Sequence, residues 1–169
     1  MLKLDSRKAL NDQTLMDHFD ALHTSQKYRC LSPAGLVIGS GAKAKVKIAN
    51  TITYLHNGIF KSKTTAELAF TATSMDIAPN ADAVQEACYL MCLAADGTPS
   101  FTMGAIASGA GNAVLPEVPA DKTPVGYVRI AVEAGATLFN ASTDDLDASH
   151  LTVTYVDLGY LAPRFDAVQ

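Results

Sequence analysis

The chain has 169 residues, of which 49% are apolar and 18% charged. These values are typical of one globular domain with a hydrophobic core, with room for an added arm. The longest uninterrupted apolar run, 87–95, has 9 residues, far fewer than the roughly 20 that cross a bilayer, so we expect no membrane span. Tryptophan is absent and aromatic residues make up only 7%, which fits poorly with aromatic-rich lectin compositions.

Charge is divided unevenly along the chain. Residues 1–63 carry ten Lys/Arg and four Asp/Glu, whereas residues 64–169 carry three and thirteen, so a net +6 precedes a net −10. This asymmetry suits docking on an acidic surface or contact between copies of the chain, although solvation alone would also explain it.

The cysteines indicate a reducing compartment. There are three of them, Cys30, Cys88 and Cys92, with no CxxC spacing, so we expect reduced thiols and neither a disulfide framework nor a zinc site. The first residues lack the hydrophobic centre of a secretory signal, so we expect synthesis in a cytoplasm.

The N-terminal stretch differs in pattern from the rest. Leu15, Phe19 and Leu22 recur at i, i+4 and i+7 with aspartates between them, which predicts a short amphipathic helix over about residues 7–23. We assign residues 1–33 to an N-terminal helical or extended arm, which would pack either on its own domain or on another subunit.

From Gly35 onward the apolar period changes from 3.6 to 2. Residues 44–56 alternate as one strand with a buried side and a lysine-lined wet side, and Asn57-Gly58 predicts a two-residue hairpin turn. Further strands are expected over 65–73, 86–95, 100–107, 127–132 and 151–158. Three prolines within 115–124 exclude a helix there, so this segment must cross between sheets or wrap an edge.

In all, we count seven or eight closely spaced strands, which predict a mainly β protein. We expect a β-sandwich or jelly-roll-like domain over residues 34–169.

No catalytic or cofactor motif is found. The glycines of 36–43 lack the GxxxxGK[ST] spacing and precede a strand, and the four histidines are scattered. The aspartates of 143–147 lack the alternating calcium-loop pattern. We therefore expect no metal, no cofactor and no enzyme activity.

A basic stripe is the one argument for nucleic-acid binding. Its residues are Lys43, Lys45, Lys47, Lys61 and Lys63. The stripe lacks interleaved aromatic residues and the chain as a whole is acidic, so we expect no nucleic-acid partner. Lysines in such positions also discourage pairing of sheet edges.

Residues 115–128, preceded by the expected hairpin around Asp96-Gly97, resemble the β-domain of tailed-bacteriophage virion proteins, especially head decoration proteins and head fibres. The resemblance covers about the C-terminal half of the chain. It implies a non-enzymatic, homotrimeric or otherwise repeated subunit, located in the virion and assembled in the host cytoplasm. The absence of a long heptad stalk argues against an extended fibre.

On this hypothesis the partner of the arm is the major capsid protein or another virion protein. Apolar arm residues would lie on the shell and basic ones would face acidic patches. The predicted capsid contacts are Lys3, Arg7, Lys8, Leu15, Phe19, Leu22, Lys27 and Arg29. The β domain would self-associate through Phe70, Phe101 and Tyr127.

Two alternative functions belong to other classes of protein than capsid decoration. A tail, baseplate or fibre component with a receptor- or carbohydrate-binding role would need exposed aromatic residues, for which the candidates are Tyr28, Tyr54, Phe139 and Tyr160. A small hydrolase would need ionisable groups gathered in a pocket.

Overall fold

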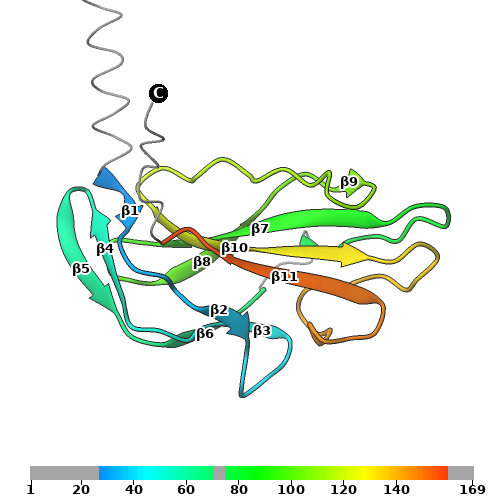
Figure 1. The fold of residues 1–169 in the computed structure, drawn as a ribbon, viewed down its shortest axis with the longest axis horizontal. Coiled ribbons are helices and arrows are strands. Elements are labelled where there is room, and N and C mark those ends of the chain that lie inside the picture. Colours follow the sequence, from blue (N-terminus) through cyan, green and yellow to red (C-terminus); the bar gives the residue numbers. More distant parts are fainter. Residues whose placement is uncertain (1–26, 71–74, 160–169) are drawn as a thin grey trace, which may run out of the picture.

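The computed structural model describes residues 27–70 and 75–159, which form a mainly β structure of antiparallel sheets (Figure 1). The predicted helix over 7–23 lies outside the described residues, as do the capsid contacts predicted between Lys3 and Leu22. No helix in the described part has the length and apolar character that crossing a membrane requires.

The largest sheet is built around one central apolar strand. Its strands are β7 (Gln85–Leu93), β8 (Pro99–Met103), β9 (Ala107–Ser108), β10 (Thr123–Val132) and β11 (Leu151–Asp157). The order is β11-β10-β7-β8, and β9 also pairs with β7. Strand β7 is therefore the central strand, and its side chains are buried on both faces of the sheet from Glu86 to Leu93, which is why its sequence is apolar at nearly every position.

The N-terminal half forms two three-stranded sheets. One has the order β1-β4-β5 and the other β2-β3-β6. The strands are β1 (Arg29–Cys30), β2 (Leu36–Ile38), β3 (Lys45–Ile48), β4 (Ile52–His56), β5 (Ile59–Lys63) and β6 (Ala66–Ala69). Each of these sheets is antiparallel throughout.

The single strand predicted over 44–56 is wrong, because the structure divides it into β3 and β4. The N–H groups of Ala49 and Asn50 donate to the carbonyls of Gly35 and Ala34, at 3.3 and 3.1 Å, and so leave the strand ladder. The predicted buried side is nevertheless confirmed on both strands. Its members are Val46, Ile48, Ile52 and Tyr54.

Both predicted hairpins are confirmed. Asn57 and Gly58 have φ of 51° and 77°, the left-handed values that a tight turn between β4 and β5 needs. Gly97, with φ of 81°, lies in the turn between β7 and β8.

The core contains side chains from all three sheets, and its centre is an aromatic cluster. Phe70 stacks on Phe101 with ring centroids 4.5 Å apart and meets Tyr89 edge-on at 4.9 Å. The Tyr89 hydroxyl donates to the Met75 carbonyl at 2.6 Å, which satisfies its polar end. Burial raises the pKa of this hydroxyl.

The boundary predicted at residue 33 needs correction. Strand β1 pairs with β4 through Arg29 opposite Leu55 and Cys30 opposite Tyr54, and Cys30 is buried. Residues 29–30 therefore belong to the β body. A two-residue strand is too short for apolar periodicity to reveal it.

All three thiols are free and buried. Burial raises the pKa of Cys92 to about 11 and also raises those of Cys30 and Cys88. Because the thiolate is the reactive form, we expect the native chain to react very slowly with Ellman's reagent at pH 8, and all three thiols to react in guanidinium chloride. Rapid labelling of any thiol without denaturant would contradict this packing.

The loop between β2 and β3 is attached to a carboxylate. Glu67 accepts hydrogen bonds from the Ser40 hydroxyl at 2.8 Å and from the Ser40 and Gly41 N–H groups at 2.9 and 3.3 Å. These bonds lower the pKa of Glu67. The stabilisation is therefore present above the carboxyl's ordinary pKa of 4.5 and is lost as the pH falls through the lowered value.

We expect Glu67→Gln to lower the melting temperature at pH 7 and the deficit to shrink as the pH is lowered toward 3, because protonation increasingly removes the charge of the wild-type carboxylate. Thermal unfolding of both proteins across this range measures the deficit. A deficit that stays constant or grows on acidification would contradict the role of the charged carboxylate.

Candidate interaction surface

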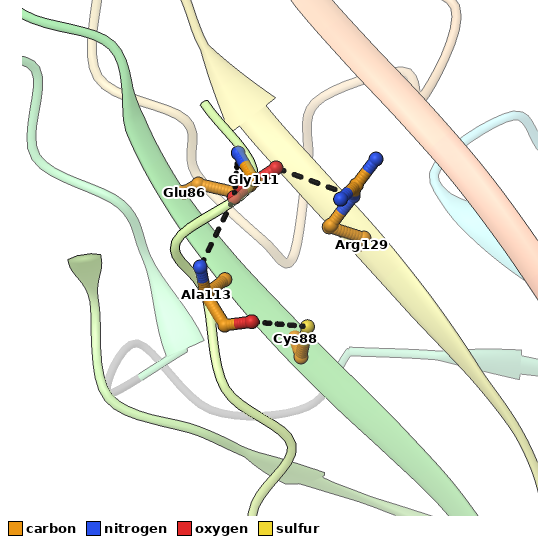
Figure 2. A network of polar contacts seen from close by, with 5 residues as sticks. All are labelled: Glu86, Cys88, Gly111, Ala113 and Arg129. Atoms are coloured by element: carbon orange, nitrogen blue, oxygen red, sulfur yellow. Dashed lines mark hydrogen bonds and ion pairs between the residues drawn. The ribbon is translucent and has the colours of Figure 1, made fainter. Parts of the chain in front are cut away.

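A segment without regular structure covers the outer face of the large sheet. We call residues 109–122 the strap. The side chains of β7 that point away from the aromatic core are Glu86, Cys88, Leu90 and Cys92, and all four are buried. The strap lies against this face, with the Ala113 carbonyl accepting a bond from Cys88 Sγ at 3.7 Å (Figure 2).

One buried carboxylate attaches the beginning of the strap. Glu86 Oε2 accepts the N–H groups of Gly111 and Ala113 at 2.8 and 3.1 Å, and its Oε1 lies 3.2 Å from Arg129 Nε (Figure 2). Gly109 and Gly111 adopt φ of 91° and 84°, values that favour glycine. These glycine conformations direct backbone N–H groups toward the Glu86 carboxylate. The carboxylate thus holds the strap to β7, the central strand of the sheet.

Side-chain hydrogen bonds attach the far end of the strap. The Tyr28 hydroxyl donates to Asp121 Oδ1 at 2.8 Å, and Lys122 Nζ donates to the Ser100 hydroxyl at 2.6 Å. The bond to Asp121 raises the pKa of Tyr28. Just beyond, the Thr123 hydroxyl donates to the Leu55 carbonyl at 2.9 Å. The strap is therefore fixed at both ends.

The middle of the strap faces two ways. Its half-buried residues recur at every third position, at 113, 116, 119 and 122, the period of an extended polyproline-like segment. Between them, Val114, Leu115 and Val118 are exposed, Val114 at 71%. The strap therefore covers the sheet with one side and presents apolar side chains to solvent with the other.

More apolar surface lies where the described chain begins. The Gly58 N–H donates to the Lys27 carbonyl at 3.1 Å, so residue 27 lies beside the β4–β5 turn. Immediately after this turn, Ile59 and Phe60 are 62% and 71% exposed. Contiguous exposed apolar residues often mark interaction sites.

A pocket of about 260 Å³ lies at the same end. It is lined by Tyr28 and by strap residues and their neighbour Pro124. The Tyr28 ring also meets His56 edge-on at 5.1 Å, and His56 Nδ1 lies 3.4 Å from the Thr123 hydroxyl. The Thr123 hydroxyl donates its proton to the Leu55 carbonyl and not to His56, so the pair does not resemble an activated threonine nucleophile. These contacts hold β4, β10 and the strap together.

The predicted capsid contacts are described only in part. Lys27 is half-buried and lies next to the β4–β5 turn, while Arg29 is exposed on β1. Both lie at the end of the body that carries the pocket, since Tyr28 between them lines it. The other six predicted contacts fall outside the described residues.

The three residues predicted for self-association do not share a surface. Phe70 is 1% exposed, so its side chain cannot reach another copy. Phe101 is partly buried against it on the core side of β8. Tyr127 is half-buried on the opposite face of the large sheet, since it alternates with buried Val128. Alternation shows which residues share a face, but not which face becomes the core.

The lysine stripe is divided between two faces. Lys45 and Lys47 alternate with buried Val46 and Ile48, so they point outward. Lys61 and Lys63 lie opposite Tyr54 and Ile52, on the core side of β5. Residues directly opposite in a pair share a face, so the predicted continuous stripe is wrong.

Several of these lysines have local partners. Lys43 pairs with Asp147 at 2.5 Å, Lys47 Nζ donates to the Ser40 hydroxyl at 3.1 Å, and Lys61 Nζ donates to the Ala95 carbonyl. Within residues 27–70 and 75–159, no group of three or more His, Cys, Asp or Glu residues could hold a metal ion.

Sequence reasoning missed the Glu86 network and the exposed strap residues. A usable signal was present, because Glu86 is an acidic residue at the start of an otherwise apolar run, and the glycine-rich stretch with Gly109 and Gly111 follows the next hairpin. A charge in that position needs donors, and glycine-rich backbone supplies them.

No family model, curated protein or solved structure matches the chain.

Replacing Glu86 with alanine should release the strap. The substitution leaves two N–H groups and Arg129 without their acceptor, so we expect about 2–4 kcal/mol less stability in urea unfolding. We also expect faster labelling of Cys88, which the strap covers. Glu133→Ala, at an exposed carboxylate, is the control and should change neither. Unchanged stability and labelling in Glu86→Ala would contradict the network's role.

Proposed function

We propose that this chain is a non-enzymatic structural subunit of a tailed-phage virion, a capsid decoration (cement) protein. It binds the head shell through its N-terminal residues and associates with further copies through its β body. The observation that carries the proposal is the set of apolar side chains exposed on the strap and after the β4–β5 turn.

These side chains are suited to binding a protein surface. Val114 and Phe60 are each 71% exposed, and burying a large apolar side chain contributes about 1.5–3 kcal/mol. The strap that carries Val114 is held by Glu86 at one end and by Tyr28 at the other. A surface ordered in advance loses little conformational entropy on binding.

The place where the N-terminal residues join the body supports the same proposal. Lys27 lies beside the β4–β5 turn and Tyr28 lines the pocket. The preceding residues carry the apolar repeat Leu15, Phe19 and Leu22. The apolar repeat and the exposed apolar residues of the β body can therefore contact the same partner surface. The basic residues among the first 63 would attract an acidic partner as the two proteins approach each other.

We propose a β-sandwich as the arrangement of the three sheets. We interpret the five-stranded sheet and the two three-stranded sheets as two layers of a β-sandwich, with the aromatic cluster of Phe70, Tyr89 and Phe101 between them. Such a compact unit can be repeated over a particle surface, and assembly there would place the protein in the virion.

One observation favours a second candidate function, a tail or fibre component that binds a receptor or carbohydrate. The pocket of about 260 Å³ has the Tyr28 ring in its wall, and sugars stack on such rings. Specific binding of the isolated chain to a glycan array, abolished by Tyr28→Ala, would favour this function over the decoration role.

The decoration role is tested by charging the apolar repeat in the full-length chain. We expect L15D/F19D/L22D to weaken co-sedimentation with heads assembled from the shell protein of the same genome by at least ~100-fold, because three apolar contacts are lost. The control D12N/D17N/D20N changes the intervening aspartates and should retain binding.

Circular dichroism should give both variants the wild-type β spectrum. Wild-type failure to bind heads, or undiminished binding by the charged variant, would refute the proposed role of the arm.

A further inference from the structure

Strand β11 forms one edge of the large sheet and pairs only with β10 among the described strands (Figure 1). It has seven residues, Leu151–Asp157, and pairs with β10 along its whole length. Its opposite side therefore presents a long strand edge.

The direction of its backbone groups follows from two hydrogen bonds at its ends. Glu133 N–H donates to the His150 carbonyl and Leu158 N–H to the Val125 carbonyl, both at 3.1 Å, so positions 150 and 158 face β10. Because antiparallel ladders alternate, positions 152, 154 and 156 also face β10, and the N–H and C=O groups of Val153 and Tyr155 face away. No hydrogen bond joins these outward groups to another described residue.

The other described edges carry features that discourage pairing. Strand β5 has Lys61 and Lys63, β6 has exposed Glu67, and β8 begins with Pro99. Strands β1 and β2 have only two and three residues. Charge, proline and short length are the usual protections of sheet edges.

The charged residue of β11, Asp157, stands at its last position, where its carboxylate accepts the N–H groups of Gly35 and Leu36 at 3.0 and 3.1 Å. The rest of the strand has none of these protections. Residues Leu151 to Val156 are uncharged, include no proline and consist of β-branched, aromatic and leucine side chains. Its register with β10 is continuous from Val132 opposite Leu151 to Gly126 opposite Asp157, so no bulge bends it away. The edge is thus left open for another strand.

We propose that β11 pairs antiparallel with β11 of a second copy of this chain, with the two-fold axis at Thr154. In this register Val153 faces Tyr155 of the second copy, and both present outward N–H and C=O groups, so the two residues exchange hydrogen bonds. The five-stranded sheets of the two copies then form one continuous sheet.

The sequence of β11 is suited to meeting itself. Thr154 faces Thr154 of the second copy, a favourable cross-strand pair, and Thr152 faces Val156. The absence of charge from Leu151 to Val156 means that no like charges are brought together across the axis. A two-fold axis makes the contact self-complementary, so a second copy suffices to close it.

This inference goes beyond the proposed function, because it names the edge that copies share and requires no particle. It also gives an even-numbered assembly, in contrast to the trimer implied by the resemblance. Its test uses the purified chain alone, so its failure leaves head binding as a separate question.

Disulfide trapping tests the pairing. At Thr154 the pair is of the non-hydrogen-bonded type, with Cα atoms about 4.5 Å apart, within the range that a disulfide spans. The three native thiols are buried. We therefore expect full-length Thr154→Cys to form a covalent dimer in most molecules on mild oxidation.

The matched control is Thr53→Cys. Thr53 is exposed on β4, which is paired on both sides by β1 and β5, so we expect at least ~10-fold less covalent dimer from it. Equal trapping at both positions would overturn the proposal.

The native contact is tested by measuring mass in solution. The wild-type chain should form a dimer whose population rises with concentration. Thr154→Lys places two lysines face to face and should raise the dimer dissociation constant at least ~10-fold. The melting curve of the dilute, monomeric variant should match that of the wild type. A wild-type chain that stays monomeric at 100 µM, or a trimer without trapping at residue 154, would refute the pairing.

Discussion

The structure depends on one buried carboxylate, because the central strand of its largest sheet is apolar on both faces. One face of β7 is covered by the aromatic core, and the other has no sheet or described helix above it. The strap covers this face, and Glu86 supplies the acceptor for its Gly111 and Ala113 N–H groups. Where a segment with no strand partner lies on an apolar face, its buried backbone donors need an acceptor, and here Glu86 provides one.

The sequence was most informative where the physical signal is local. Asn57-Gly58 determines a turn because left-handed φ is accessible to these residues, and the β7–β8 hairpin follows from a long apolar run ending at Asp96-Gly97. The division of 44–56 was hidden, because Ala49 and Asn50 bond to residues 34 and 35, which are distant in the pattern. Alternation continues through this break, so the side chains gave no sign of it.

The candidate interaction surface could be predicted less well, since alternation identifies faces without saying what covers them. Phe70 and Phe101 share a face with other apolar residues whether that face is a core or an interface, and the structure makes it the core. The prolines of 115–124 predict a non-helical crossing there. Which of its residues remain exposed depends on Glu86 and Tyr28, which lie 25 and 93 residues from their partners.

The two surfaces of this body point in different directions, and this separation matters for assembly. The strap presents Val114 and Leu115 above the face of the large sheet, whereas β11 offers backbone groups along its edge, in the plane of the sheet. A partner on the face need not displace a strand at the edge, because face contacts use apolar side chains and edge contacts use N–H and C=O groups. In the proposed assembly, one copy therefore binds a particle surface through its face and a neighbour through its edge at the same time.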